Sequence, residues 1–309
     1  MRYFVRDDTL FLRGRFRAAS TGVNGGIADV TTVLNHTVPH DFEDNPPRHL
    51  ELLTARHGLF EDYFGLMTAV NMRHLCVLQY DFVTVFITAG VTNPTASPTA
   101  PHTINIIVYS REGMVDSALL ETIVTATGAK AQALHNLGYD FPGTTTDAVA
   151  VACERDAPPS HLRCSNSVPS GHRWLHTYAG TLTGIGSRVH AAVLYGLPEA
   201  LARQQGRVVR SEPSFFIYSR YGGEHWVEWQ KENCPYYPCH FPGQRCDYCY
   251  CPCYPCADEE LGEWVESSSG GRIWGCAGCT LLHVPEIADY MKRNPEAALA
   301  ELKRLRERL

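Results

Sequence analysis

Small polar residues gather in short segments whose side chains could bind a substrate. The first such segment is Ser20-Thr21-Gly22-Val23-Asn24-Gly25-Gly26. Ser20 and Asn24 carry hydrogen-bonding groups, while Gly25 and Gly26 let backbone N–H groups come close to a ligand. An ordinary turn has the same composition, so the segment by itself fits either a binding loop or a plain connection.

Two polar residues stand in otherwise apolar surroundings. Asn105 interrupts the run TINIIVY at 103–109, and a buried amide lowers stability unless hydrogen bonds satisfy it. Asn105 therefore needs either a structural partner or a substrate. Lys130 lies among small residues at 126–134, which would let it approach a neighbouring element. A lysine that extends along the surface into solvent is the alternative.

The segment Gly143-Thr144-Thr145-Thr146-Asp147 directly precedes an expected strand. Asp147 could act as a general base or orient one, and Thr144 and Thr146 could be nucleophiles or hydrogen-bond donors. A capped turn is the alternative. Further along the chain, His176 is the residue best suited to carry a proton, although a lone histidine is more often structural. Residue order alone assigns no Ser-His-Asp or Cys-His arrangement.

Nine of the twelve cysteines form one cluster between Cys234 and Cys279. The cluster contains CxxC pairs at 246/249, 253/256 and 276/279 and a wider pair at 234/239, enough for two tetrahedral sites of four thiolates. Zinc is favoured over an iron–sulfur cluster because the surrounding Tyr, Pro and Gly residues suit a structural site. Inert thiols without a metal are the remaining alternative.

Two points about the ligands of this cluster stay open at the level of spacing. His240 and His283 flank the cysteines and could replace thiolates as ligands. If 253/256 acts as a pair, Cys251 is left without a role. The module would stabilise a small fold whose apolar core is insufficient by itself.

The elements that must position these residues are typical of a layered α/β domain. Apolar runs at 77–89, 103–109 and 148–153 predict strands, and Ala-rich segments at 115–137 and 178–195 predict helices. No glycine-rich phosphate loop is present, so we expect no nucleotide cofactor.

The two ends of the chain add a predicted hairpin and a predicted helix. Residues 3–5 and 10–16 flank an Asp7-Asp8-Thr9 turn, and Asn294-Pro295 is typical of a helix start. The composition becomes aromatic near Phe215 and then rich in Pro and Cys. We therefore expect one domain at 1–225, followed by a cysteine-rich domain with a C-terminal helix at 226–309.

Charge and hydropathy exclude several classes of protein. The 309 residues include 27 Lys and Arg against 33 Asp and Glu, and the net charge of −6 argues against a nucleic-acid partner. Apolar runs fall short of the ~18 residues that span a bilayer, and the first residues do not resemble a signal peptide. We expect a cytoplasmic protein, in which clustered thiols are more often metal ligands than disulfides.

Taken together and in order, the motifs of the first 200 residues resemble those of the adenosylcobinamide amidohydrolases. The resemblance runs from about Arg13 to Leu197 and rests on the motifs STGVNGGIADVTTVLNH, GLMTAVNM, VTVFITAGVTNP, HTINIIV, ATGAKAQAL, GTTTDAVAVAC and YAGTLTGIGSRVHAAV. Two departures are visible. The family's usual Thr-Gly-Thr before Thr-Asp is here part of FPGTTTD, and His102 stands where a glycine is common.

The cysteine cluster is similar to a small cysteine-rich, zinc-finger-like domain. That resemblance implies eight ligands and leaves Cys253 as the surplus thiol, so that the metal would be held by Cys234, Cys239, Cys246, Cys249, Cys251, Cys256, Cys276 and Cys279. The zinc would be structural. The domain could also bind a partner protein of the same pathway.

The first resemblance implies hydrolysis of the amide that joins the (R)-1-amino-2-propanol arm to the corrinoid ring of adenosylcobinamide. The product, adenosylcobyric acid, re-enters cobamide (vitamin B12) synthesis. A corrinoid-binding protein without hydrolysis is the alternative. Amide hydrolysis needs an activated water or nucleophile, donors for the oxyanion and an acid for the leaving amine.

We assign hypothetical roles to the polar residues on this basis. Asp147 is the base or orients it, and Lys130 stabilises developing charge. Asn105 and the Asn24-Gly25-Gly26 turn donate hydrogen bonds to the oxyanion or amide. The remaining contacts to the substrate are assigned to Ser20, Thr144, Thr146 and His176.

Overall fold

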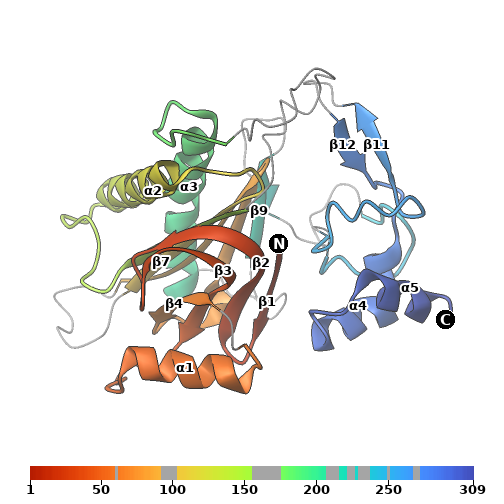
Figure 1. The fold of residues 1–309 in the computed structure, drawn as a ribbon, viewed down its shortest axis with the longest axis horizontal. Helices are drawn as coiled ribbons and strands as arrows, with labels where there is room; N and C mark the ends of the chain where they lie inside the picture. Colours follow the sequence, from red (N-terminus) through yellow and green to blue (C-terminus); the bar gives the residue numbers. More distant parts are fainter. Residues whose placement is uncertain are drawn as a thin grey trace. The chain divides into compact units, whose positions relative to one another are not determined.

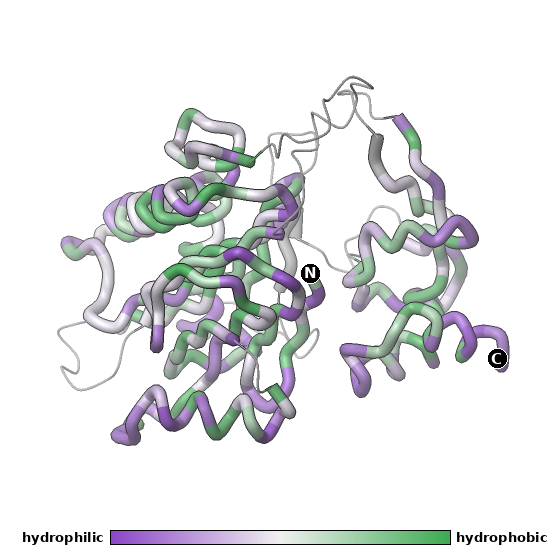
Figure 2. The backbone as a smooth tube through the Cα atoms, viewed as in Figure 1, coloured by the Kyte–Doolittle hydropathy of each residue, from purple (hydrophilic) through white to green (hydrophobic). Residues whose placement is uncertain are grey.

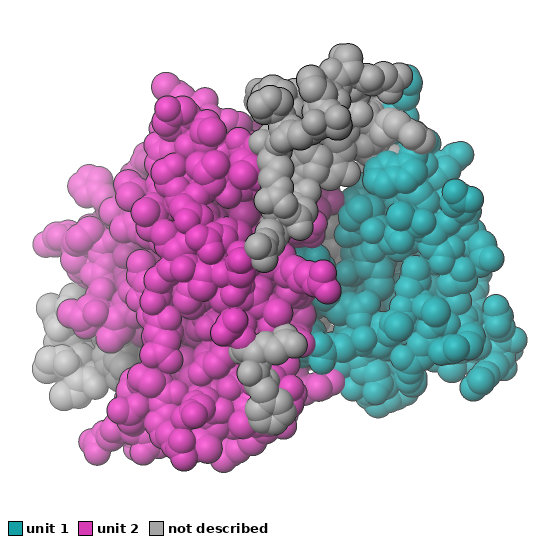
Figure 3. All heavy atoms as spheres, in the orientation of Figure 1, with its two compact units in different colours: residues 1–4, 159–172, 229–309 teal, residues 5–158, 173–228 magenta. Residues whose placement is uncertain are grey.

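The computed structural model describes residues 1–59, 62–91, 103–154, 175–206, 216–220, 227–228, 237–248, 251–266 and 272–309. The chain divides into two compact units, coloured separately in Figure 3. The larger unit holds the described residues between 5 and 228. The smaller unit combines residues 1–4 with the described residues after 229. Each unit has its own core.

A ten-stranded mixed sheet carries the order β10-β9-β5-β6-β7-β8-β2-β3-β4, and β1 pairs with β2 (Figure 1). Its strands are β1 (Arg2–Arg6), β2 (Thr9–Ser20), β3 (Gly26–Thr37), β4 (Tyr63–Thr68), β5 (Cys76–Tyr80), β6 (Val83–Gly90), β7 (Thr103–Ser110), β8 (Ala148–Glu154), β9 (Phe216–Arg220) and β10 (Val227–Glu228). The connections contain helices α1 (Pro46–Arg56), α2 (Asp116–Asn136) and α3 (Gly184–Gln204) and a short 3₁₀ turn, Met72–His74.

Helices α2 and α3 cover one face of the central strands (Figure 1). Alternate residues of β7, Ile104, Ile106 and Val108, are fully buried in a core with the alanines of α2 and the apolar side of α3. The intervening residues, beginning with Asn105, face the other way because strand side chains alternate. Small residues allow close packing: a Cβ at Gly196 of α3 would lie 2.7 Å from Leu78 of β5.

The other face is covered by a bend in the β2–β3 hairpin. The pairing register shifts between Arg13 and Phe16, which marks a β-bulge, and a Cβ at the intervening Gly14 would lie 2.6 Å from the Phe16 ring. Only the second half of β2 pairs with β8, and β4 pairs in parallel with the second half of β3. Because of this bend, the C-terminal ends of β3 and β4 pack over one face of β7 instead of pairing with it as neighbouring strands.

Helix α1 crosses from β3 to β4 and packs through a narrow stripe. Only Leu50, Leu53 and Thr54 are buried, and Figure 2 shows a largely hydrophilic helix. The Leu50 side chain occupies the space that a Cβ at Gly65 of β4 would need. No helix in the described part of the larger or smaller unit is both long enough and apolar enough to cross a membrane.

The expected layered α/β class is confirmed, as are the strands at 103–109 and 148–153, the helix at 115–137 and the N-terminal hairpin. The single strand expected at 77–89 is wrong. It is a hairpin of β5 and β6, which turns at Asp81 with φ 53°. The alternation of apolar residues continues through the turn, so the sequence pattern does not indicate that one strand ends there and another begins.

The helix expected at 178–195 begins later, at Gly184. Thr183 caps it by accepting a hydrogen bond from Gly186 N at 3.0 Å. A Cβ at Gly186 would overlap the carbonyl oxygens of Ala179 and Gly180, so the preceding chain folds back across the first turn of the helix. Tyr178 therefore lies in a loop.

The smaller unit contains a β-hairpin and two short helices. These are β11 (Glu263–Glu266), β12 (Arg272–Gly275), the 3₁₀ turn Leu281–His283, α4 (Pro285–Arg293) and α5 (Leu299–Arg306), around a core centred on Ile287, Met291 and Leu302. The C-terminal helix is confirmed, but its expected start at Asn294-Pro295 is wrong. Asn294 ends α4, with its N–H on Tyr290 O at 2.8 Å.

The β2–β3 hairpin contains a partly buried histidine, His36, whose protonation should weaken the fold. His36 Nδ1 lies 2.7 Å from Thr9 Oγ1, and its ring stacks on His49 at 5.2 Å. Burial, reinforced by His49, lowers the pKa of His36 from 6.5 to about 4. Between these values the unfolded chain binds more protons than the folded chain, so stability falls as the pH is lowered from 6.5 toward 4.

We expect His36→Gln to flatten this dependence. Between pH 7 and pH 5, wild type should lose free energy of unfolding on the order of 1 kcal/mol that the variant does not lose. The effect is limited to this size because the ring is only partly buried. Urea unfolding at both pH values measures it. The exposed His135 of α2, changed to Gln, should retain the wild-type slope. Equal slopes for His36→Gln and wild type would contradict the assignment.

Candidate functional site

One edge of the sheet collects most of the polar residues singled out above. β7 and β8 run parallel and begin at this edge, while β6 and β2 run antiparallel to them and end there. The topology therefore brings together the start of β7, the turn before β8 and the turn after β2. Thr21, in the turn after β2, forms backbone and side-chain hydrogen bonds with Val149. Val149 lies two residues after Asp147, so these bonds attach the turn to the start of β8.

Asp147 is the centre of this edge, and its carboxylate accepts from four donors. Oδ1 accepts from Ile104 N at 2.9 Å and from the Thr144 hydroxyl. Oδ2 accepts from Thr144 N at 3.0 Å and from Lys130 Nζ. A carboxylate offers about four acceptor positions, so those of Asp147 are filled. Its place is set by three different parts of the chain.

Lys130 reaches Asp147 from helix α2 and is buried, which excludes the surface alternative. The side chains of this ion pair are only 7% and 8% exposed. Gly143 makes room for them: a Cβ there would overlap both Lys130 Nζ and Asp147 Oδ2. Sequence reasoning did not select Gly143, because only the contact across 17 residues reveals why a side chain is excluded.

The two threonines of the turn lie at the same edge. Thr144 contacts Asp147 as described, and Thr146 Oγ1 lies 2.8 Å from Thr103 Oγ1 at the start of β7. Both belong to the turn directly before β8, which runs from this edge into the sheet. Their contact with a substrate stays a prediction.

The turn at 20–26 is held by its own hydrogen bonds. Ser20 Oγ accepts from Gly22 N at 3.0 Å, and Gly25 N donates to Gly22 O at 3.0 Å. Asn24 has φ 54° and Gly26 has φ 141°, and a Cβ at Gly26 would meet nothing within 4 Å. The turn is thus rigid, exposed and open at Gly26.

Asn105 is buried, with 1% of its surface exposed, on the face of β7 opposite to α2. Its Nδ2 donates to Asn35 Oδ1 at 2.9 Å and to Met67 O at 2.8 Å. Asn35 in turn donates to Thr88 Oγ1 at 2.9 Å. Both amide protons of Asn105 are therefore used, which contradicts the expected role as donor to an oxyanion or amide. Its Oδ1 has no hydrogen-bond partner.

Sequence reasoning missed Asn35, which lies in one of the motifs but was not singled out. Its position directly after the apolar pair Val33-Leu34 is the signal that could have identified it. Its partner Asn105 is 70 positions away, and only the bend of the β2–β3 hairpin brings the two amides together.

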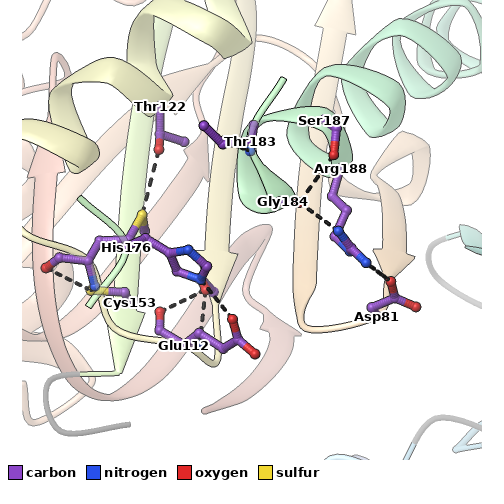
Figure 4. A network of polar contacts seen from close by, with 12 residues as sticks. Asp81, Glu112, Thr122, Cys153, His176, Thr183, Gly184, Ser187 and Arg188 are labelled. Carbon is purple, nitrogen blue, oxygen red and sulfur yellow. Dashed lines mark hydrogen bonds and ion pairs between the residues drawn. The ribbon is translucent and has the colours of Figure 1, made fainter. Parts of the chain in front are cut away.

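His176 lies elsewhere. It forms a bridge with Met114, and its Nε2 lies 2.7 Å from Glu112 Oε2, past the other end of β7 (Figure 4). The eight residues of β7 separate it from the Asp147 edge by roughly 25 Å at the usual rise per residue. The ring stacks on Phe82 at 5.5 Å. The structure thus gives His176 a structural partner and does not bring it to the other site residues.

The cysteine cluster is described in part. Cys234 and Cys249 lie outside the described residues. Gln244 Nε2 lies 3.2 Å from Cys239 Sγ and 3.5 Å from Cys246 Sγ, so these two sulfurs lie close together. Cys251 donates a hydrogen bond to Cys253, which lowers the pKa of the Cys253 thiol. Neither thiol of this pair is set apart as surplus.

A cavity of roughly 230 Å³ in the smaller unit is lined by six thiols and by His240 and His283. The two rings are 4.5 Å apart, and partial burial together with His283 lowers the pKa of His240. These donor types suit zinc or an iron–sulfur cluster. Among the residues that the structure describes, however, no three His, Cys, Asp or Glu side chains are grouped to hold one metal ion.

Two family models match the chain. The model described as adenosylcobinamide amidohydrolase matches residues 6–208, and the model described as a cysteine-rich small domain matches residues 225–306. No solved structure matches.

Individual relatives agree with the first model. A protein of Methanosarcina mazei named adenosylcobinamide amidohydrolase is 41% identical over 205 residues, which cover 65% of this chain and 98% of that protein. A Halobacterium salinarum protein of the same name is 30% identical over 193 residues, or 57% and 76% of the two chains.

A shorter match links the chain to a third protein. The probable cobalt-factor III C(17)-methyltransferase of Methanothermobacter thermautotrophicus is 44% identical over 64 residues, or 20% and 17% of the two chains. The family match over 6–208 and the relative matched over nearly its whole length lead to one conclusion: the chain belongs to the adenosylcobinamide amidohydrolase family and is a hydrolase that acts on an amide.

Proposed function

We propose that the protein hydrolyses the amide between the corrinoid ring and the (R)-1-amino-2-propanol arm of adenosylcobinamide. Water is added across the C–N bond: the carbonyl carbon receives the hydroxyl and becomes adenosylcobyric acid, and the nitrogen receives the proton and leaves as the amine. The observation that carries this proposal is the buried cluster of Lys130, Asp147 and Thr144 at the edge where β7 and β8 begin.

The donors around Asp147 favour one of its two expected roles. Two of the four are backbone N–H groups and the third is Lys130. None of these three becomes a nucleophile by giving a proton to the carboxylate. The fourth, the Thr144 hydroxyl, can do so while its oxygen faces a substrate. Asp147 therefore orients and polarises Thr144, and Lys130 supplies positive charge to the site.

Donors for the oxyanion are assigned to the backbone of Asn24 and Gly26 in the turn at 20–26, since both protons of Asn105 are engaged and Gly25 N already donates to Gly22 O. The turn is anchored to β8 beside Asp147, and at Gly26 the backbone is open to a ligand. Backbone N–H groups held in place before the reaction stabilise a tetrahedral oxyanion without reorganisation. Ser20 and Asn24 contact the substrate at the rim of this turn, and Thr146 contacts it beside Asp147.

The smaller unit is a structural addition to this chemistry. We place the boundary between the two parts near residue 225, between the two family matches. Zinc bound by the cysteine cluster would stabilise the fold of this part, whose core is small. Nine cysteines of the described residues are free thiols, which suits the reducing cytoplasm.

A second candidate function concerns the cysteine-rich part. The cysteine-rich family model matches residues 225–306, and 64 residues of the chain match a protein named probable cobalt-factor III C(17)-methyltransferase. We infer that the cysteine-rich part is a module that recurs among proteins of corrinoid chemistry. Such a module would bind a partner protein of the pathway. Co-purification of a corrinoid enzyme with the full chain, lost in a cysteine variant that remains folded, would support it.

The principal test is product analysis by mass spectrometry after incubation with adenosylcobinamide. We expect equal amounts of adenosylcobyric acid and 1-amino-2-propanol. Recovery of unchanged adenosylcobinamide that co-elutes with the protein would instead support the corrinoid-binding alternative.

Asp147→Asn should reduce kcat/KM at least about 100-fold, because the substitution removes the acceptor of the Thr144 proton and presents an N–H group to Lys130. Steady-state kinetics measures the loss, with thermal unfolding recorded on the same sample. The matched control is Asp140→Asn, an exposed position seven residues earlier, which should stay near wild type. Turnover of Asp147→Asn within a few-fold of wild type would exclude the assignment.

Cys246→Ser should lower the bound metal and the melting temperature of the full chain, since a structural site contributes folding energy. Elemental analysis and calorimetry measure the two effects. Cys153→Ala serves as the control, because Cys153 is buried in β8 of the larger unit and should leave the metal content unchanged. A full metal complement in Cys246→Ser would remove that residue from the ligand set.

A further inference from the structure

The strongest unexplained feature of the larger unit is the side-chain oxygen of Asn105. The residue is 1% exposed, and its Oδ1 has no hydrogen-bond partner, although the neighbouring amide of Asn35 is hydrogen-bonded. A buried acceptor without a donor destabilises a fold. Such a group is retained where a ligand supplies the missing donor.

The identity of the free atom is determined by its surroundings. Oxygen and nitrogen of an amide are easily exchanged in a structure, so the assignment has to follow from the partners. Asn105 Nδ2 lies 2.8 Å from Met67 O, a backbone carbonyl that can only accept. Rotating the amide would set two acceptors against each other and leave the protons unused. The atom left free is therefore the acceptor, Oδ1.

A rigid polar chain holds this acceptor in place. Asn35 accepts from Asn105 and donates to Thr88, and Thr88 is the register partner of Asn105 on the adjacent strand β6. All three residues are buried. Since apolar side chains would fill these positions at lower cost, the chain serves to orient the amide of Asn105.

The acceptor lies next to the proposed centre. Asn105 pairs in register with Ala148, the residue after Asp147, and the preceding residue, Ile104, donates its N–H to the Asp147 carboxylate. Asn105 and Asp147 are thus adjacent positions of neighbouring strands at the same edge.

We propose that Asn105 Oδ1 accepts a hydrogen bond from the N–H of the scissile secondary amide and makes the enzyme specific for amides over esters. This inference rests on the proposed function. An amide presents a donor N–H on one side and an acceptor carbonyl on the other. The acceptor of Asn105 repels the carbonyl and attracts the N–H, so it selects the orientation in which the carbonyl oxygen points away, toward the backbone donors of the turn.

The test compares adenosylcobinamide with its ester analogue, in which oxygen replaces the N–H of the aminopropanol arm. Asn105→Leu is close in size and lacks the acceptor. We expect it to lower kcat/KM for the amide roughly 10–100-fold and to change kcat/KM for the ester about 3-fold or less. The reason is that the ester has no N–H group, so it makes no hydrogen bond that the variant could lose.

Thr122→Val of α2 is the matched control. It removes a hydroxyl at an equally buried position outside this chain, where the hydroxyl donates to Ala118 O, and it should change both substrates by the same factor. If Asn105→Leu is unfolded by circular dichroism, Asn105→Ser, which keeps a polar group, replaces it. An unchanged amide-to-ester ratio in the folded Asn105 variant overturns the inference.

A binding measurement separates this inference from the proposed function. If wild type hydrolyses neither substrate, the proposed function fails. Calorimetric affinities for the amide and the ester then decide about Asn105: a loss of about 10-fold or more confined to the amide in the variant supports the acceptor role. Equal losses for the two corrinoids overturn it.

Discussion

The buried ion pair between Lys130 and Asp147 is the interaction on which the rest of the site depends. Removing two charges from water is costly, and the attraction between them repays this only with good geometry and further hydrogen bonds. Asp147 has these bonds, from the Ile104 and Thr144 backbones and the Thr144 hydroxyl. The pair thereby ties helix α2, strand β7 and the turn before β8 to one point, and Gly143 leaves the space for it.

The second face of the sheet contributes through a different kind of contact. Here the site depends on neutral amides, and the bulge in β2 decides their position because it turns the ends of β3 and β4 against β7. The charged cluster and the amide chain both include residues near the start of β7. The helix layer positions the first on one face, and the bent hairpin positions the second on the other.

The cysteine-rich unit stands apart from this construction. It has its own small core and its own cavity lined by thiols and imidazoles, and the amidohydrolase match ends before it begins. The donors are of the right type for a metal, but among the described residues they are not brought together in threes. The thiols of Cys239 and Cys246 come close as a pair, and both lie within hydrogen-bonding distance of Gln244 Nε2.

The sequence by itself determined the layered α/β class, most of the central elements and the family, because these follow from local patterns and continuous motifs. The tertiary structure alone decided the rest. It placed His176 with Glu112 beyond the opposite end of β7, and it engaged both amide protons of Asn105 while leaving its side-chain oxygen without a partner. Both outcomes depend on contacts between residues 64 to 70 positions apart, which follow from strand order and from sheet curvature at a single bulge. Neither property has a signal in the local alternation of polar and apolar residues.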